Sequence, residues 1–387
     1  MIVGYDAIRA LGNTTGLGNY ARGILRAIHR TDPARQLELY SPKPPLAQFA
    51  GLAAELAAPL REPPLLWRGP GARKIWRIAR MGRAAARNGV TLFHGLTHEL
   101  PRDLAATGIP GVVTFHDLLF HRHPEWFAAF DRASYAWRYR ASAKGAAAII
   151  AVSAATRADV VEIYQVPPER VVVIPPVVDE RFAIPVTATG RTAVLEGHHL
   201  PATFLLTLGT LETRKNQRVA ILALAALDAR HTPPLVIAGH DGGMAHELAV
   251  LARQQGVADR VLIRPDLPAE DLPAVMQSAA VFVYPSLAEG FGMPIVEALA
   301  AGAPVVTTAG GCFPEAGGPA SLYVPATDAA ALADAIRRVL DDSALATRMR
   351  AAGQAHAARF AGDLLAPRVL AVYDAVVARR PLPTGAP

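Results

Sequence analysis

The sequence predicts an α/β protein built from two doubly wound parallel sheets. Short apolar, β-branched segments alternate with Ala- and Leu-rich helical segments along nearly the whole chain, which is the pattern of strand–helix–strand units. Most strand segments are continuously apolar, as expected for parallel strands that helices cover on both faces. The chain has 387 residues, of which 51% are hydrophobic and 19% charged. That length is sufficient for two or three domains.

The predicted strands form two series of six. The first series is Met1–Tyr5, Leu37–Tyr40, Thr91–His94, Val112–Phe115, Ala148–Val152 and Val171–Ile174. The second series is Thr203–Leu208, Leu235–Ala238, Val261–Ile263, Val281–Tyr284, Pro304–Thr307 and Ser321–Val324. Two series of this length predict two domains with a sheet each. Ligands of doubly wound sheets bind beyond the carboxyl ends of the strands, so we expect the site in the cleft between the domains.

The predicted boundary lies between the two series. Several prolines interrupt regular structure there, and Thr187–Leu200 is polar and without periodicity. We therefore expect an N-terminal domain over residues 1–185 and a second domain over 186–363. A last helix, Leu364–Ala378, begins a C-terminal segment (364–387) whose proline-containing tail we expect to be frayed.

The composition excludes several classes of protein. Cys312 is the only cysteine, so neither a disulfide framework nor a cysteine zinc site is possible, and a reducing compartment fits best. The longest apolar window is far shorter than a membrane span, and the N-terminus lacks the pattern of a signal peptide. We expect a soluble cytoplasmic protein.

Positive charge is concentrated in the first half of the chain. Residues 1–185 contain 23 Lys and Arg against 15 Asp and Glu, and residues 61–90 alone contain eight basic residues and one acid. Apolar side chains are interleaved there, and helical spacing places Ile75, Ile78 and Ala79 on one face, with Trp76 and Met81 beside it. This segment could be a packed surface helix or a helix on an anionic lipid surface. Nucleic acid is disfavoured because no known binding module is recognisable.

The first candidate motif is a glycine-rich helix start. Gly16, Gly18 and Ala21 fit the G-x-G-x-x-A pattern of dinucleotide-binding proteins, with Glu38 near the end of the next strand. A nicotinamide-dependent oxidoreductase is therefore one hypothesis. Ala7–Thr14 separate the glycines from the first strand, however, whereas that pattern belongs directly after the strand. A helix start of this kind suits any anion, and it could also be an ordinary turn.

Two further motifs follow strands of the second series. Arg214 and Lys215 lie in the segment after Thr203–Leu208. The forked guanidinium of Arg214 and the ammonium of Lys215 could together bind a diphosphate, or both side chains could simply be solvated. After Val281–Tyr284, Glu289 and Glu297 lie eight residues apart on either side of a glycine-rich helix start. If Pro294 is the first helical residue, Glu297 lies in the first turn and points back toward Glu289. Two carboxylates there suit a ligand with many hydroxyls and a phosphate.

These motifs resemble the retaining family 4 glycosyltransferases of the GT-B fold. The run from Glu289 to Gly302 is similar to the E-x(7)-E signature of that family, and the Gly4–Tyr20, Val113–Leu118 and Gly209–Asn216 segments occur in the family's order and spacing. The similarity covers nearly the whole chain and points to the mannosyltransferase-like branch that uses GDP-sugars. In this fold, the last helix crosses back to the N-terminal domain.

The resemblance also implies roles for individual residues. Glu289 and the backbone N–H groups of Phe291, Gly292 and Met293 would hold the donor sugar, and Glu297 the ribose. Lys215 and Arg214 would neutralise the diphosphate, which the Gly16–Gly18 loop would approach. His116 would lie against the transferred sugar. Thr210 stands where some relatives carry an arginine, and Arg264 lies at the base-binding edge, in place of a more usual glycine-containing turn.

No metal or other cofactor is expected. His116, Asp117, His121 and His123 lack the spacing of a metal site, and the sequence contains no Asp-x-Asp pair. The expected enzyme transfers a hexose from a nucleotide diphosphate sugar, with GDP favoured over UDP, to a glycan or lipid-linked acceptor in polysaccharide or lipopolysaccharide synthesis. It would be cytoplasmic, with a possible peripheral contact to the membrane through residues 61–90. A sugar-nucleotide binding protein without catalysis is the third hypothesis.

Overall fold

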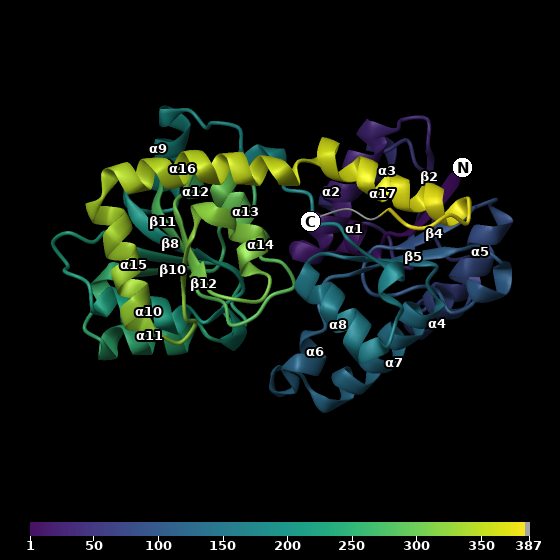
Figure 1. Ribbon diagram of the computed structural model, residues 1–387, viewed down its shortest axis with the longest axis horizontal. Coiled ribbons are helices and arrows are strands. Elements are labelled where there is room, and N and C mark those ends of the chain that lie inside the picture. The colour runs from purple at the N-terminus through teal and green to yellow at the C-terminus, as the bar shows by residue number, and fades with distance from the viewer. Residues whose placement is uncertain (384–387) are drawn as a thin grey trace. The chain divides into compact units, whose positions relative to one another are not determined.

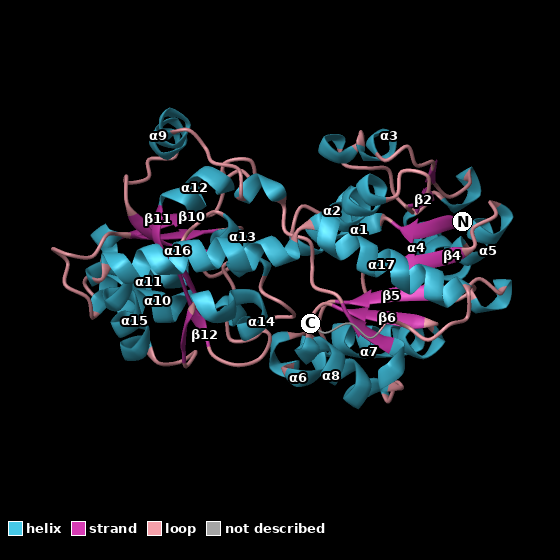
Figure 2. Ribbon diagram, turned by 45° about the horizontal axis from the view of Figure 1, so that its top comes forward, coloured by secondary structure: helices cyan, strands magenta, loops and turns pink. Residues whose placement is uncertain are grey.

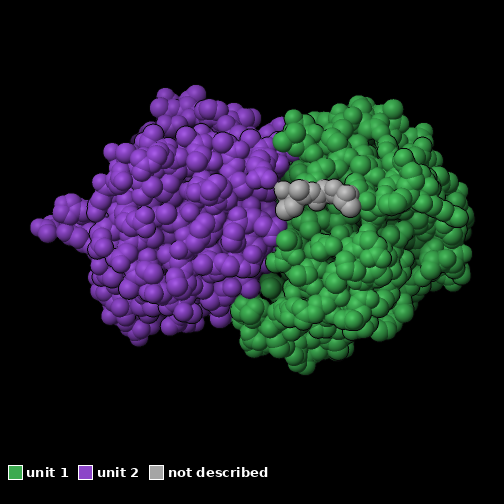
Figure 3. Space-filling model, viewed as in Figure 1, with its two compact units in different colours: residues 1–177, 362–387 green, residues 178–361 purple. Residues whose placement is uncertain are grey.

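The chain folds into two compact units, each with its own parallel sheet. A computed structural model describes residues 1–383. Unit 1 comprises Met1–Val177 together with the residues from Gly362 onward, and unit 2 comprises Val178–Ala361 (Figure 3). This confirms the predicted fold class of two doubly wound domains. The structure divides the chain at Val178, within the predicted seam but eight residues before the expected boundary. The Val178 N–H donates to the Phe360 carbonyl, 2.9 Å away in unit 2.

Unit 1 contains a seven-stranded parallel sheet in the order β3-β2-β1-β4-β5-β6-β7 (Figures 1 and 2). Its strands are β1 (Ile2–Asp6), β2 (Gln36–Tyr40), β3 (Leu60–Arg61), β4 (Leu92–Gly95), β5 (Gly111–Phe115), β6 (Ala148–Ala151) and β7 (Val171–Val173). Its helices are α1 (Ile8–Gly12), α2 (Gly16–Thr31), α3 (Leu52–Glu55), α4 (Pro70–Ala79), α5 (Met81–Arg87), α6 (Leu119–Arg122), α7 (Ala129–Gly145), α8 (Ala154–Tyr164) and α17 (Gly362–Val377). The two-residue β3 was not predicted, because so short a strand leaves no pattern in the sequence.

Unit 2 contains a six-stranded parallel sheet in the order β10-β9-β8-β11-β12-β13. Its strands are β8 (Phe204–Leu208), β9 (Leu235–Ala238), β10 (Val261–Arg264), β11 (Ala279–Tyr284), β12 (Val305–Thr308) and β13 (Leu322–Val324). Its helices are α9 (Ala188–Gly197), α10 (Gln217–Ala225), α11 (Ala245–Gln254), α12 (Leu272–Ser278), α13 (Met293–Ala300), α14 (Phe313–Gly317), α15 (Ala329–Asp341) and α16 (Ser343–Ala357). All six strands predicted for this half are present.

The segment expected to be unpatterned contains a helix. The Thr187 hydroxyl caps α9 by accepting from the Gly190 N–H, 3.1 Å away, and α9 packs against α12. A side-chain cap and packing against a distant helix stabilise α9 although the segment has no amphipathic periodicity. Residues 187–200 lie in unit 2, within the second domain predicted from the sequence.

The last helix belongs to unit 1, as the fold resemblance implied. In Figure 1, α17 is the yellow helix beside α2. A Cβ added at Gly362 would lie 2.9 Å from that of Ala27, so only glycine permits this close approach. The Asp374 carboxylate, in α17, forms an ion pair with the Arg35 guanidinium, with 2.8 Å between oxygen and nitrogen. The tail predicted to be frayed follows α17, and its last residues, 384–387, lie outside the described residues.

The basic segment packs differently from the predicted face. Two helices replace one, because Arg80 leaves the helical backbone conformation between α4 and α5. Trp76 and Met81 are buried, while Ile75 is 54% exposed, so the apolar face predicted through Ile75 is wrong. Trp76 is 2% exposed and cannot reach a lipid surface.

Arg77 is a structural residue of unit 1. Its guanidinium lies 2.7 Å from Asp6 and 3.3 Å from Glu99. Burial alone would lower the pKa of Arg77, but these two carboxylates raise it. Removing one partner of such a cluster leaves a buried charge unpaired, so Arg77 does not belong to the charges that a membrane could engage.

Candidate active site

The candidate site of unit 2 lies where the strand order reverses. β8 has β9 on one side and β11 on the other, and the loops that follow β8 and β11 leave the sheet side by side. Such a switch point is where open α/β sheets bind ligands. The loop after β8 carries Arg214 and Lys215, and the loop after β11 carries Glu289.

Backbone contacts hold these two loops together. Asn216 adopts a left-handed conformation (φ 56°) that ends the short turn carrying Arg214 and Lys215, and its amide donates to the carbonyls of Pro285 and Ala326 at 3.0 and 2.8 Å. The Leu287 N–H donates to the Arg214 carbonyl at 2.9 Å. The position of both cations is therefore fixed by backbone as well as by side chains.

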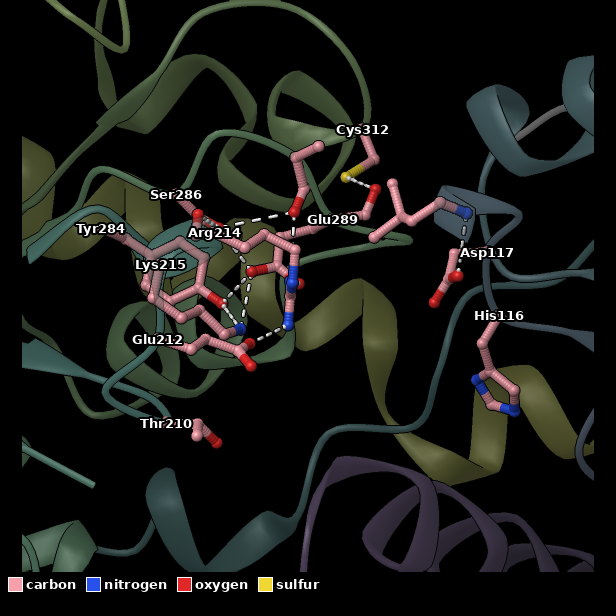
Figure 4. Close-up of polar contacts among 12 residues, drawn as sticks. His116, Asp117, Thr210, Glu212, Arg214, Lys215, Tyr284, Ser286, Glu289 and Cys312 are labelled. Atoms are coloured by element: carbon pink, nitrogen blue, oxygen red, sulfur yellow. Dashed lines mark hydrogen bonds and ion pairs between the residues drawn. The ribbon is translucent and has the colours of Figure 1, made fainter. Parts of the chain in front are cut away.

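Glu289 is the centre of the side-chain cluster (Figure 4). One carboxylate oxygen lies 2.6 Å from the Lys215 ammonium and the other 2.7 Å from the Arg214 guanidinium. The hydroxyls of Tyr284 and Ser286 donate to Glu289 Oε1 at 2.9 and 2.7 Å. The structure thus brings together Arg214, Lys215 and Glu289, three of the charged residues singled out in the sequence.

Sequence reasoning missed the neutral and acidic partners of this cluster. The Tyr284 hydroxyl also accepts from Lys215 Nζ at 2.9 Å, and Glu212 accepts from the other end of the Arg214 guanidinium at 2.6 Å. Tyr284 and Ser286 directly precede the E-x(7)-E run, and Glu212 precedes the basic pair. The sequence shows that these residues are near Glu289 and the basic pair, but it does not show that their side chains point toward them.

The electrostatics of the cluster favour the charged forms. Burial alone would raise the pKa of Glu289, but Lys215 and Arg214 outweigh it and lower the pKa to about 2. Burial would lower the pKa of Arg214, whereas Glu289 and Glu212 raise it. Burial and Glu289 raise the pKa of Tyr284 well above 10, so its phenol stays neutral. A carboxylate that can accept from hydroxyls therefore lies between two fixed cations that can bind phosphate.

The second carboxylate, Glu297, occupies a different position from the expected one. α13 begins at Met293 rather than at Pro294, and Glu297 lies beyond its first turn. It is 9% exposed, and burial, with a contribution from Asp179, raises its pKa to about 7. Gly292, with φ at 101°, precedes the helix, and the N–H of Met293 is among the first-turn groups that have no acceptor within the helix.

We expect the Glu297 carboxyl to make stability depend on pH. Folded chains retain this proton up to about pH 7, whereas unfolded chains release it near pH 4.5. Stability is therefore lost as the pH rises from 4.5 to 7, by roughly 3 kcal/mol for a shift of this size. Thermal unfolding of Glu297→Gln should show a smaller fall in Tm between pH 5 and pH 8 than the wild type. Equal slopes would show that Glu297 is ionised in the folded chain.

The other residues of unit 2 that were predicted to bind the sugar donor lie in the loops at the switch point or at the edge of the sheet. Thr210 follows the strand-end glycine, and its carbonyl accepts from Gln217 at 3.0 Å. Phe291 is buried and its ring packs against Phe360, with centroids 5.4 Å apart. Arg264 ends the edge strand β10, and its guanidinium donates to the carbonyl of His198 at 3.2 Å. The Arg264 side chain therefore holds the end of the α9 segment.

In unit 1, the glycine-rich segment begins α2 at Gly16. Helix α1 lies between β1 and this segment, which is unlike a dinucleotide-binding loop. Glu38 lies within β2, where it accepts from Tyr40 at 2.5 Å and from Arg61 at 2.9 Å. Because the Glu38 carboxylate is already bonded to Tyr40 and Arg61, its position does not favour the nicotinamide-dependent oxidoreductase, in which it would bind the ribose of the cofactor.

His116 follows β5 and is held as a neutral imidazole. Its Nε2 lies 3.0 Å from the Leu96 carbonyl, to which it donates, and burial lowers its pKa to about 3. The ring edge of Tyr20, from α2, packs against it with centroids 4.5 Å apart. Tyr20 thereby connects His116 to the helix that begins at Gly16. Among residues 1–383, no group of three or more His, Cys, Asp and Glu side chains is placed to hold a metal ion.

Two family models match the chain, one in each half. Glycosyltransferase Family 4 matches residues 14–182, and Glycosyl transferases group 1 matches residues 196–356. These two models identify the protein as a glycosyltransferase. The chain belongs to the GT-B glycosyltransferases, with a family 4 and a group 1 domain.

The relatives include a mannosyltransferase and a D-inositol 3-phosphate glycosyltransferase. The O-antigen chain mannosyltransferase B of Escherichia coli is 28% identical over 93% of this chain and 96% of that protein. The D-inositol 3-phosphate glycosyltransferase of Xylanimonas cellulosilytica is 34% identical, over 60% of this chain and 58% of that protein.

Solved structures share the fold. Anabaena Alr3699/HepE, determined in complex with UDP and glucose, has a TM-score of 0.73 at 19% identity and covers 97% of this chain and 99% of its own. WaaG, a glycosyltransferase involved in lipopolysaccharide biosynthesis, has a TM-score of 0.70 at 19% identity and covers 95% of this chain and 98% of its own.

Proposed function

We propose that this glycosyltransferase moves a hexose, mannose or a related sugar, from a GDP-sugar to a glycan or lipid-linked acceptor in the synthesis of a cell-surface polysaccharide such as lipopolysaccharide. The observation that carries the proposal is the cluster of Glu289, Lys215 and Arg214 at the switch point of the second sheet. It offers a carboxylate to sugar hydroxyls directly beside two cations for a diphosphate. The mannosyltransferase relative that aligns over nearly the whole chain supports mannose.

We propose that the transfer retains the anomeric configuration. Lys215 and Arg214 would offset the charge that develops on the departing diphosphate. The acceptor hydroxyl would attack from the face that the phosphate leaves, and the departing phosphate would accept the proton of that hydroxyl. His116, with its lowered pKa, would contact the sugar as a neutral group. The anomer of the first product, read by NMR before it equilibrates, tests this step.

Binding and turnover measurements separate the hypotheses. Isothermal titration with GDP, UDP and NAD should give binding of GDP, weaker binding of UDP and none of NAD. Preferred binding of UDP would overturn the choice of base, and HepE, solved with UDP, makes this the alternative to exclude. Turnover of GDP-mannose with a lipid-linked oligosaccharide distinguishes the enzyme from a binding protein without catalysis.

We expect activity without a divalent cation. The two cations beside Glu289 would supply the charge that Mg²⁺ gives to leaving phosphates in other enzymes. Turnover of the nucleotide sugar should therefore persist in excess EDTA and should not increase when Mg²⁺ is restored. An absolute requirement for Mg²⁺ would contradict the proposal that no cofactor is needed.

We also propose that the enzyme acts in the cytoplasm, with residues 61–90 in peripheral contact with an anionic membrane. No helix among the described residues is long and apolar enough to span a bilayer. Leu65 and Leu66 are more than 80% exposed, and exposed basic side chains lie on the helices that follow. At about 1 kcal/mol for each basic residue near an anionic surface, three or four would give reversible binding.

Vesicle binding tests this contact. Vesicles that contain anionic lipid should bind the wild type at low salt and release it as the salt concentration rises. Replacement of Lys74, Arg80, Arg83 and Arg87 by glutamine should abolish that binding without changing nucleotide affinity. Arg77 is excluded from this variant because its ion pairs stabilise the fold. If the wild type ignores such vesicles, a soluble acceptor becomes the better hypothesis.

A further inference from the structure

Arg22 is a buried arginine beneath the glycine-rich start of α2. Its side chain is directed to the backbone of the preceding segment: one guanidinium nitrogen donates to the carbonyls of Ala10 and Asn13 at 2.9 and 2.8 Å. The other donates to the Asn19 side chain at 2.6 Å, and Phe49 lies against its face with the ring centroid 3.8 Å away. One side chain therefore connects α1, the loop and the first turn of α2.

The loop that Arg22 holds is tightly folded. Asn13 Oδ1 accepts from the N–H groups of Thr15 and Gly18 at 2.8 and 3.2 Å. A Cβ at Gly18 would lie 2.0 Å from the Asn13 carbonyl oxygen, so the backbone of the loop rests directly on the helix start. The conformation of residues 13–19 depends on this contact and on the Arg22 hydrogen bonds.

Within the described part of the chain, no carboxylate neutralises the charge of Arg22. The residue is 6% exposed, and none of the ion pairs within residues 1–383 includes it. All of its partners are neutral, and burial, with a smaller effect of Arg26, lowers its pKa to about 10, so it remains a cation at neutral pH. The other buried arginines differ: Arg77 has Asp6 and Glu99, and Arg214 has Glu289 and Glu212.

A buried charge without a counter-charge is costly unless something compensates it. The start of α2 adds a positive helix end to the same place, with the N–H groups of Gly16 and Leu17 in its first turn. We propose that Arg22 is a positioning residue that holds the Gly16–Gly18 loop in the form that approaches the donor's diphosphate, and that its charge strengthens the attraction of this loop for that anion. This inference rests on the proposed function, because the diphosphate belongs to the nucleotide-sugar donor.

The test compares Arg22→Gln and Arg22→Lys with the control Arg26→Gln. Arg26 lies one turn further along α2, where it forms an exposed ion pair with Glu55. Titrations use GDP and GMP, or UDP and UMP if the wild type prefers uridine nucleotides. Arg22→Gln should weaken binding of the nucleoside diphosphate by about ten-fold or more and that of the monophosphate much less. KM for the nucleotide sugar should rise more than kcat falls.

Arg22→Lys should show an intermediate loss, because lysine keeps the charge but not the three hydrogen bonds. Arg26→Gln should match the wild type. If Arg22→Gln does not fold, Arg22→Lys tests the inference instead, because the same ratio of diphosphate to monophosphate affinity should fall in this variant. An unchanged ratio, or equal losses for both nucleotides that follow a fall in Tm, would overturn the inference while the proposed function stands. Absence of any nucleotide binding by the wild type would instead overturn the proposed function.

Discussion

Lys215→Ala is expected to lower kcat/KM for the nucleotide sugar by about 100-fold or more, because it removes a charge-assisted contact to the leaving diphosphate. The Lys215 ammonium is held between Glu289 and Tyr284, at 2.6 and 2.9 Å, and so is positioned before any ligand binds. Affinity for the nucleoside diphosphate should fall in the same variant. Steady-state kinetics and titration measure the two effects.

Arg218→Gln is the matched control for Lys215→Ala. Arg218 lies three residues further along the chain, on α10, and its ion pair with Glu247 is half-exposed. Its loss should leave kinetics within experimental error, since exposed ion pairs contribute little. Full activity in Lys215→Ala would remove the assignment of the diphosphate to this cation.

Glu289→Gln should also lower kcat/KM by about 100-fold or more, but through kcat rather than through binding of the nucleotide. The Glu289 carboxylate contacts both cations. Glutamine removes that competing negative charge, so affinity for the nucleoside diphosphate should be kept or should increase. The lost contact is the one to the hydroxyls of the transferred sugar.

The opposite effects on diphosphate affinity distinguish the two variants. A Tm comparable to that of the wild type is needed to interpret Glu289→Gln, because Tyr284 and Ser286 also donate to this carboxylate. If Glu289→Gln lost nucleotide affinity in parallel with Lys215→Ala, Glu289 would act only by holding the cations. A near-normal kcat would show that it does not contact the sugar.

The order of strands, the fold class and the three charged residues of the cluster could be predicted from the sequence. Continuous apolar strands separated by helical segments specify parallel sheets, and in such sheets functional side chains follow the strands. Arg214, Lys215 and Glu289 each lie directly after a strand, so their meeting at one edge follows from local pattern and general topology. The short strand β3 and the helix α9 left no such pattern.

What only the tertiary structure decided is which charge each buried group faces. Arg77 and Arg22 are alike in sequence, each an arginine among apolar residues in a helical segment. One meets Asp6 and Glu99 and stabilises the fold, while the other meets only neutral groups. In the same way, burial raises the pKa of Glu297, whereas Glu289, eight residues before it, is paired with two cations that lower its pKa. The sequence determines its own periodicity and composition, but desolvation and pairing depend on partners far away in the chain, which only folding brings within a few ångströms.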